Sequence, residues 1–159
     1  MGAQIFSVDY YLAVVEDKPG EGSRFLSWLA SQEVNLLAFN ACPIGGGKSQ
    51  LTIYPVNSFW LGHQARQKGY RLDGPHHAFI VHGDDELGAL TDIHHKLANA
   101  DINVSTSNGI VDGRGGYRYI LHVDPGDFEM AQNVLEVTDD PEAWRKFSLK
   151  IYRRFEAMG

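Results

Sequence analysis

The sequence lacks the features that mark several large classes of protein. Cys42 is its single cysteine in 159 residues, which excludes an intrachain disulfide and a site built from several thiolates. No basic leader precedes a long apolar run, so we expect neither a signal peptide nor a membrane span and predict a cytoplasmic protein. The net charge of -6 leaves no excess of Lys and Arg, so we expect no nucleic-acid partner and no membrane partner.

Enzyme motifs are scarce as well. Neither a Gly-x-Ser-x-Gly nucleophile motif nor a His-Glu-x-x-His metal motif occurs, so we expect no enzyme, no cofactor and no metal site. His82 and His122 are the pair for which a metal or pH-sensing role arises, because both lie near the ends of expected neighbouring strands. Solvated or locally bonded histidines are the preferred interpretation.

The stretch PIGGGKSQ, residues 43–50, has the glycines, lysine and serine of a phosphate-binding loop. However, Cys42 occupies the position of that loop's first glycine. The residues that follow alternate as in a strand, whereas a phosphate loop requires a helix there. We therefore interpret the stretch as a hairpin turn between two strands.

An internal repeat supports this interpretation. When the sequence is shifted by 68 residues, residues 11–56 lie over residues 79–124 without a gap. The identical pairs fall at loop glycines, in an expected helix core and at expected strand starts: Asp17/Asp85, Gly20/Gly88, Leu29/Leu97, Ala30/Ala98, Asn35/Asn103, Asn40/Asn108, Gly45/Gly113 and Gly47/Gly115. Such a repeat predicts one supersecondary unit present twice.

Each copy has the pattern strand, helix, strand, strand, helix, strand. In the second copy the first helix is predicted from Leu87, Leu90, Ile93 and Leu97, which recur at helical spacing. Asn57 or Ser58 is expected to cap the later helix of the first copy, and Asp127 that of the second. Two strands are expected in residues 70–83, joined near Gly74 and Pro75.

The predicted fold class is therefore α+β, with two ferredoxin-like βαββαβ units in tandem, antiparallel sheets and helices on one face. The first unit is expected in residues 1–74, the second in residues 75–137 and a tail in residues 138–159. The spacing of the tail's apolar residues favours a helix, with a strand in residues 147–152 as the alternative.

The first strand is apolar at consecutive positions, from Tyr10 to Val15. A strand that is apolar on both sides is covered on both sides. Helices cover one face, so we expect the sister unit or a second chain to cover the other, and hence a homodimer.

Residues 8–137 resemble a tandem pair of ACT domains. The strongest match is VEDKPGEGSRFLSWLASQEVNLLAF, an apolar strand, Asp-x-Pro-Gly, a helix with spaced leucines and Val-Asn before the next strand. The second copy keeps Asp85, Gly88 and Asn103 but has Leu87 in place of Pro19. The resemblance implies a regulatory unit that binds a small ligand, often an amino acid, at interfaces between units.

The residues of such a site have suitable chemistry. A loop that enters a helix N-terminus presents unpaired N–H groups to a carboxylate, and Gly20 and Gly22 allow a ligand to approach the backbone closely. Asp17 can accept a hydrogen bond from an amino group, and Asn35 offers both a donor and an acceptor. The candidate ligand-binding residues are Asp17, Pro19, Gly20, Glu21, Gly22, Asn35 and Leu36 in the first copy, and Asp85, Leu87, Gly88 and Asn103 in the second.

The predicted function is that of a non-enzymatic regulatory protein that senses an amino acid between ACT-like units. The alternative is a ligand-free interaction module that oligomerises or docks on a metabolic enzyme. The same glycines and asparagines also suit ordinary turns, which leaves both functions open at this point.

Overall fold

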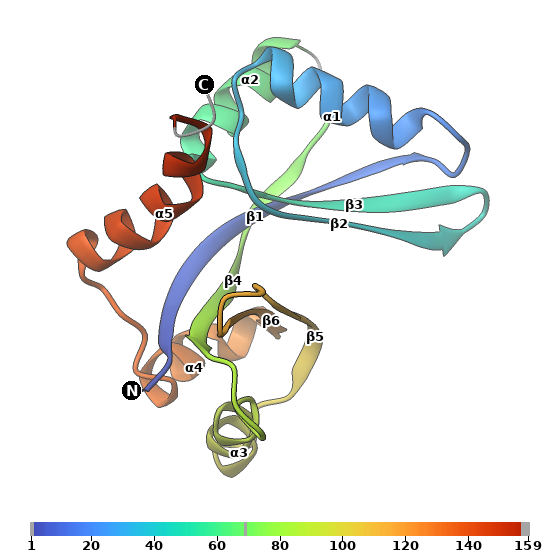
Figure 1. The fold of residues 1–159 in the computed structure, drawn as a ribbon. Helices are drawn as coiled ribbons and strands as arrows, with labels where there is room; N and C mark the ends of the chain where they lie inside the picture. Colours follow the sequence, from blue (N-terminus) through green and yellow to red (C-terminus); the bar gives the residue numbers. More distant parts are fainter. Residues whose placement is uncertain (1, 69, 157–159) are drawn as a thin grey trace. The chain divides into compact units, whose positions relative to one another are not determined.

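The computed structural model describes residues 2–68 and 70–156. The elements, shown in Figure 1, are β1 (Gln4–Glu16), α1 (Glu21–Ser31), β2 (Leu36–Gly45), β3 (Lys48–Pro55), α2 (Ser58–Lys68), β4 (Asp73–Asp84), α3 (Thr91–Asn99), β5 (Val104–Val111), β6 (Gly116–Val123), the 3-10 helix η1 (Pro125–Asp127), α4 (Phe128–Val134) and α5 (Pro141–Glu156). The strands are hydrogen-bonded in the order β2-β3-β1-β4-β6-β5. The strand pairs β1–β3, β2–β3, β4–β6 and β5–β6 are antiparallel.

The chain forms two compact units, and neither is one continuous piece of sequence. The first-repeat unit contains Asp9–His76 and Lys150–Gly159. The second-repeat unit contains Met1–Val8 and His77–Leu149. The expected boundary between residues 74 and 75 lies at the start of β4, close to the division after His76. The structure adds that the first residues of the chain belong with the second repeat.

Strand pairing follows one register in both repeats. Tyr11 pairs with Ile53 and Phe79 with Leu121, and every later pair of β1 with β3 has its counterpart 68 residues on in β4 and β6. The same holds for β2–β3 and β5–β6, including an irregularity between Leu36 and Ala38 that recurs between Val104 and Thr106. The expected hairpin is present, because β2 and β3 are joined at residues 45–48. Thus the repeat seen in the sequence is also a repeat of backbone hydrogen bonding.

The core of the first-repeat unit lies between two helices and one face of its strands. Phe25 and Leu29 of α1 and Leu61 of α2 are buried against β1 and β3. Within α2, Gly62 is required by a close approach, because a Cβ atom there would lie 2.7 Å from the Tyr11 hydroxyl oxygen. That hydroxyl donates a hydrogen bond to the Ser58 carbonyl oxygen at 3.2 Å. Gly62, a poor helix former by propensity, therefore serves the packing of α2.

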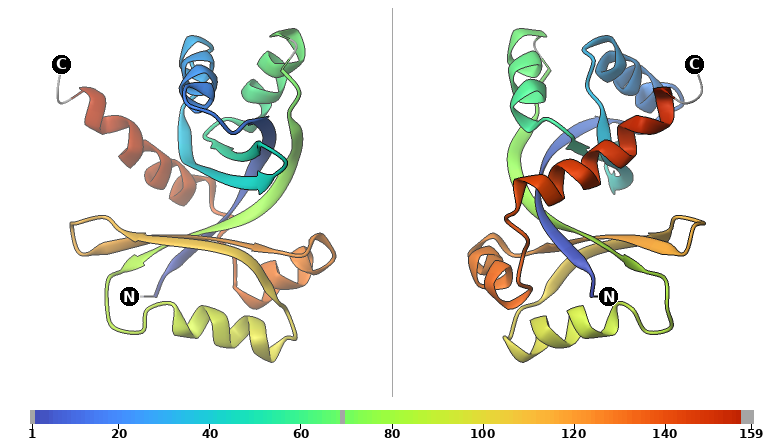
Figure 2. Two further views of the ribbon diagram at one scale, coloured as in Figure 1. Left: turned by 90° about the vertical axis from the view of Figure 1, so that its right-hand side faces the viewer. Right: turned by 60° about the vertical axis from the view of Figure 1, so that its left-hand side comes forward.

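The second-repeat unit is covered on both faces of its strands. Ile93 and Leu97 of α3 and Ala131 of α4 pack on one face. Figure 2 shows α3 and α4 on one side of β5 and β6, and the first half of α5 on the other. There Phe6 of β1 stacks on Phe147 of α5, with the ring centroids 5.1 Å apart. The second face of this unit is therefore covered by the tail helix of the same chain, whereas the cover that we expected over residues 10–15 of the first repeat stays a prediction.

Three local predictions were wrong. The segment around Gly74 and Pro75 belongs to β4, which is one continuous strand where two were expected. Leu87 lies outside α3 with its side chain fully exposed, because turns precede a helix that starts only at Thr91. Asp127 makes no capping hydrogen bond, whereas Asp124 accepts one from the Gly126 N–H at 3.0 Å and caps η1. By contrast, Asn57 caps α2 as predicted, since its side chain accepts from the Trp60 N–H at 3.0 Å.

The α1 and α3 helices end alike, and this similarity can be tested. Glu33 and Asp101 follow the two helices with φ of 57° and 59°. This left-handed backbone is strained for a side chain and is common for glycine at helix ends. We predict that Glu33→Gly and Asp101→Gly each raise the free energy of unfolding by about 0.5–1 kcal/mol in urea denaturation. Ser27→Gly, inside α1, should lower it. A loss of stability from either of the first two substitutions would contradict the shared geometry.

The contribution of α5 is testable in the same way. Phe147 is only 4% exposed, so Phe147→Ala removes a ring from a closed environment. We predict a loss of about 3–5 kcal/mol in the free energy of unfolding. The control is Phe59→Ala, because Phe59 is 77% exposed and its truncation should change stability by less than about 0.5 kcal/mol. Equal effects of the two substitutions would show that α5 does not pack on the sheet.

Candidate functional site

The loop between β1 and α1 is held by the hairpin turn beside it. The Asp17 N–H donates to the Gly47 carbonyl oxygen at 2.9 Å. Gly20 then turns the chain into α1 with φ of 95°, and its carbonyl oxygen accepts from the Arg24 N–H at 2.9 Å. Because L side chains rarely adopt this φ, Gly20 is needed for the turn itself. Gly47 was not among the predicted site residues, although its identity with Gly115 could have indicated a role.

The N-terminus of α1 is open. The Glu21 N–H donates to the Lys18 carbonyl oxygen at 3.4 Å, but no side chain caps the N–H groups of the next residues. A Cβ atom on Gly22, in the first turn, would meet no heavy atom within 4 Å. Free N–H groups and the helix dipole favour an anion, so this end of α1 has room and polarity for a carboxylate group.

Charged side chains surround the first loop. Lys18 Nζ lies 2.7 Å from a Glu16 carboxylate oxygen and 4.0 Å from one of Glu21, and Arg24 lies 3.4 Å from Glu21. The hydrogen bond from Lys18, followed by its charge and that of Lys48, lowers the pKa of Glu16. The hydrogen bond and charge of Glu16 in turn raise the pKa of Lys18. The cations therefore already have carboxylate partners, and all of these pairs reach solvent.

Asn35 and Leu36 do not join this loop within one unit. Leu36 pairs with Pro55 at one end of β3, whereas Glu16 pairs with Lys48 at the other end. At the usual rise of a strand, the two ends are about 23 Å apart. The Asn35 side-chain oxygen accepts from the Leu36 N–H at 2.9 Å, which is a local role. A ligand at the first loop therefore cannot touch Asn35 of the same unit.

The equivalent loop of the second repeat has the same hydrogen bond to its hairpin turn and the same glycine, but it continues into additional turns. The Asp85 N–H donates to the Gly115 carbonyl oxygen at 2.9 Å, and Gly88 has φ of 76°. Hydrogen bonds from Ala89 to Glu86 and from Thr91 to Gly88 wind this loop into turns before α3. Asn103 is exposed and precedes β5, as Asn35 precedes β2.

Acidic groups dominate this second loop. Burial, followed by the charges of Glu86 and Asp84, raises the pKa of Tyr117. A carboxylate ligand would be repelled here, whereas the first loop offers Lys18 and Arg24. The two loops therefore share the hydrogen bond to the hairpin turn and a glycine at positive φ, but they differ in charge and in where the helix begins.

The two histidines singled out in the sequence lie apart. His82 is opposite Arg118 in the β4–β6 register, and His122 lies four residues further along β6, which corresponds to about 13 Å. Within residues 2–68 and 70–156, no three His, Cys, Asp or Glu side chains gather as metal ligands would. None of the helices described there is long and apolar enough to span a membrane.

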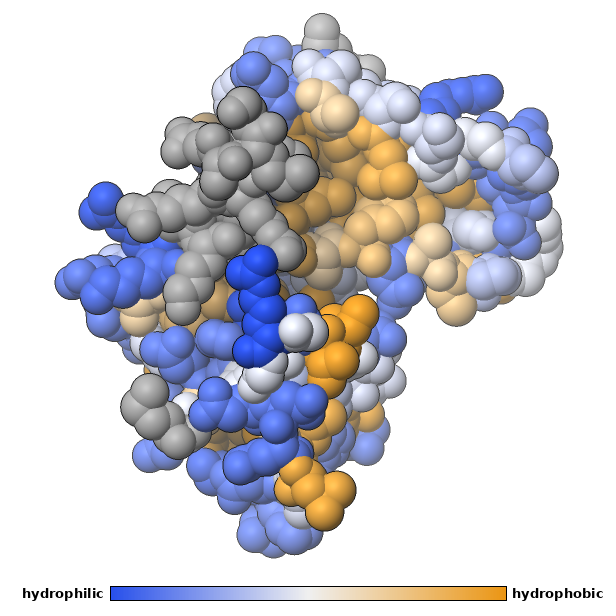
Figure 3. Space-filling view, in the orientation of Figure 1, coloured by the Kyte–Doolittle hydropathy of each residue, from blue (hydrophilic) through white to orange (hydrophobic). Residues whose placement is uncertain are grey.

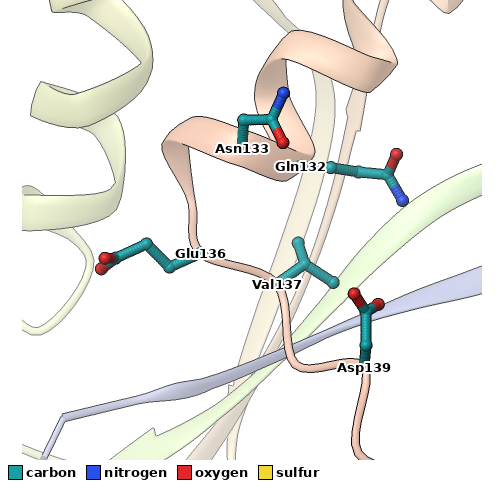
Figure 4. Close-up of a pocket in the computed structure, with 5 residues that line it drawn as sticks. All are labelled: Gln132, Asn133, Glu136, Val137 and Asp139. Atoms are coloured by element: carbon teal, nitrogen blue, oxygen red, sulfur yellow. The ribbon is translucent and has the colours of Figure 1, made fainter.

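A shallow polar cavity lies elsewhere, at the end of α4. Its volume is about 260 Å³, and Gln132, Asn133, Glu136, Val137 and Asp139 line it. In Figure 4 the Gln132 and Glu136 side chains point in opposite directions, so the polar groups do not converge on one point. None of the predicted site residues lines this cavity.

No family model matches the chain, and no curated protein matches it. Solved structures do. Protein BT0572 from Bacteroides thetaiotaomicron superimposes with a TM-score of 0.70 at 12% identity, over 84% of this chain and 88% of that chain. The ligand-free regulatory subunit of aspartate kinase from Thermus thermophilus gives 0.58 at 12% identity, over 86% and 95%. The corresponding subunit from Thermus flavus gives 0.51 at 12%, over the same shares.

These identities are low, so the likeness concerns the fold. The chain has an ACT-like α+β fold of the kind found in aspartate kinase regulatory subunits.

Proposed function

We propose that this chain is a non-enzymatic regulatory protein that binds an amino acid at the loop between β1 and α1. The observation that carries the proposal is the likeness of 86% of the chain to 95% of a regulatory subunit of aspartate kinase. Regulation in such a protein works through differential affinity, because a ligand shifts an equilibrium only towards the arrangement that it binds better.

The ligand's carboxylate would bind the uncapped N-terminus of α1. Gly20 and Gly22 leave the backbone open, Pro19 shapes the turn, and Lys18 and Arg24 supply positive charge. Asp17 in the same loop would accept from the ligand's amino group. Glu21 would be released from Lys18 and Arg24 as the carboxylate binds, so the site exchanges one ion pair for another.

We propose that the second loop has a structural role and binds no ligand. Asp85 and Gly88 fix the turn as their counterparts do, while the neighbouring acids disfavour a carboxylate ligand. On this proposal Leu87 and Asn103 contact no ligand.

A second copy of the chain would bring Asn35 and Leu36 to the ligand, which they cannot reach within their own unit. β2 is at the end of the strand order, so among the described residues no strand pairs with its outer edge. Figure 3 shows apolar surface gathered between α1 and β2. In β2, four consecutive apolar residues are only half-buried: Leu36, Leu37, Ala38 and Phe39. An apolar edge strand is suited to pairing with another chain, and a two-fold axis would bring β2 of both copies together.

The other end of the strand order is different. β5 also has a free edge in the described structure, but the residues that correspond to Leu37, Ala38 and Phe39 are Ser105, Thr106 and Ser107, all exposed. One repeat therefore keeps an apolar edge and the other a polar edge. We propose that β2 forms the homodimer interface and brings Asn35 and Leu36 of one copy near a ligand on the other.

The β2 edge alone also favours the alternative function, a ligand-free interaction module that docks on a metabolic enzyme. The two functions differ in their response to small molecules, since a ligand that binds only the folded state raises the unfolding midpoint. No response to any of the twenty amino acids at millimolar concentration would favour the interaction module.

Ligand binding is tested by thermal unfolding with each of the twenty amino acids. We predict that at least one raises the midpoint and that Gly22→Val abolishes this rise, because the new side chain fills the open space at the first turn of α1. Gly22 is preferred to Gly20, since at φ of 95° a valine at position 20 would be strained whether or not a ligand binds. Ser27→Val, later in α1, is the control. A midpoint rise that persists in Gly22→Val would exclude this loop.

The proposed dimer interface is tested by sedimentation velocity. We predict that Leu37→Glu converts a dimer into a monomer, because two like charges would meet at the shared edge. Ser105→Glu, the same change at the equivalent position of β5, should leave the dimer intact. A monomeric wild-type protein, or a Leu37→Glu variant that still dimerises, would contradict the interface.

A further inference from the structure

The exposed side of α2 is aromatic and basic. Residues 49–72, which contain this helix, include no Asp and no Glu. Phe59, His63 and Arg66 follow one another at helical spacing and so share one side of α2. Phe59 is 77% exposed, its ring lies nearly parallel to the His63 ring at a centroid distance of 6.3 Å, and Arg66 is exposed as well. This side of the helix therefore presents an apolar ring and a guanidinium group to solvent.

Trp60 holds this side of α2 in place against the end of α1. Its indole N–H donates to the Gln32 carbonyl oxygen at 2.8 Å. Glu33, the next residue in the chain, is exposed, and so are Arg66 and Arg71. Of these three exposed charges two are positive, so the surface offered to a partner is rigid and has an excess of positive charge.

The second repeat has the opposite charge at the equivalent helix. No Lys or Arg occurs in residues 119–144, which contain α4. Glu129 and Asn133 are one turn apart on α4, Glu136 follows the helix, and all three residues are exposed. Met130, which is 53% exposed, adds a flexible apolar side chain. The outer side of α4 therefore presents carboxylates and a thioether where α2 presents a guanidinium and a ring.

The cavity at the end of α4 places two of the acidic groups within one hollow. Glu136 and Asp139 both line its volume of about 260 Å³, and Figure 4 shows them on opposite sides of Val137. Lys96 of α3 lies 3.9 Å from Glu136 but also 3.3 Å from Asp92, so two carboxylates share one lysine. Negative charge is thus in excess here, and a guanidinium, whose five donors are spread over a plane, suits carboxylates that stand apart.

Like sides would repel each other and unlike sides would attract. Two α2 helices would bring two Arg66 side chains together, and two α4 helices would bring carboxylates together, whereas α2 against α4 sets Arg66 towards Glu136 and Asp139. The same contact sets the Phe59 ring against Met130, and contacts between sulfur and aromatic rings are favourable. Because every copy of the chain carries both sides, a second copy is a partner whose chemistry the sequence itself supplies.

We propose that the exposed side of α2 in one copy binds the exposed side of α4 in a second copy. The contact joins unlike surfaces, so a pair of copies retains one free α2 and one free α4, and association continues to larger assemblies. It is separate from the pairing through β2 and from the ligand site proposed above, and it rests on neither. Because its charged groups are exposed, salt weakens it.

The test is sedimentation velocity of the wild type, of Arg66→Glu and of Glu136→Lys. We expect the wild type to form larger species as its concentration rises, and each variant alone to associate roughly tenfold more weakly, because like charges then meet. An equal mixture of the two variants should form the larger species again, since the α4 of Arg66→Glu and the α2 of Glu136→Lys are unchanged. Both residues are exposed, so unchanged thermal midpoints show that the variants are folded.

The controls separate this contact from other kinds of association. Arg114→Glu makes the same change of charge at an exposed residue of the β5–β6 turn and should behave as the wild type does. Phe59→Ala should weaken the association without loss of stability. Raising the salt from about 0.05 M to about 0.5 M should dissociate the α2–α4 contact, so that pairing through β2 is measured alone at the higher concentration.

Two results would overturn the proposal. One is a wild-type protein that associates no more than Arg66→Glu does. The other is a mixture of the two variants that sediments as the separate variants do. If Glu136→Lys fails to fold, Asp139→Lys takes its place, since Asp139 is exposed and lines the same cavity.

Discussion

Backbone hydrogen bonding between neighbouring strands is the constraint on which the rest of this structure depends. In each repeat the first strand pairs with the third in the same register. A hairpin turn with glycine at two shared positions then accepts a hydrogen bond from the loop before the first helix. The bond from Asp17 to Gly47 and its counterpart from Asp85 to Gly115 have the same length, 2.9 Å. This bond fixes the start of both loops, whereas their charges and the start of the following helix differ. Charge and exposure can then differ while the fold remains.

Divergence of the repeats is most evident at the edges and faces of their strands. β2 kept apolar residues where β5 has serine and threonine, and the first loop kept lysine and arginine partners where the second is acidic. The second repeat has His82 and Arg118 at the positions where the first has Val14 and Gln50. These differences are the basis of the proposal that ligand binding and chain pairing belong to the first repeat.

Much of the fold could be predicted from the sequence because its signals are local. Glycines at fixed spacing mark the hairpin turns, leucines at helical spacing mark α1, and the alternation of β3 identifies a strand. The failures came where tertiary structure outweighs local pattern. Leu87 has the spacing of a helix residue, but Gly88 turns the chain at positive φ before α3 can start. Pro75 suggested a break, yet it lies near the start of a strand, where a missing N–H is tolerated.

The candidate site was predictable only in its backbone. Asp-x-Pro-Gly indicated the loop and Gly20 indicated the turn, but sequence spacing could not show that Asn35 lies at the far end of β3 from the loop. The cover formed by α5 was missed as well, because a contact between Phe6 and Phe147 spans most of the chain.

A ¹H–¹⁵N NMR titration with the amino acid that binds tests the central claim most directly, since it reports on both loops in one sample. The account predicts amide shift changes at residues 20–23, at the N-terminus of α1, and none at residues 88–91 before α3. Equal changes in both loops, or changes confined to the second, would contradict the proposed division between the repeats.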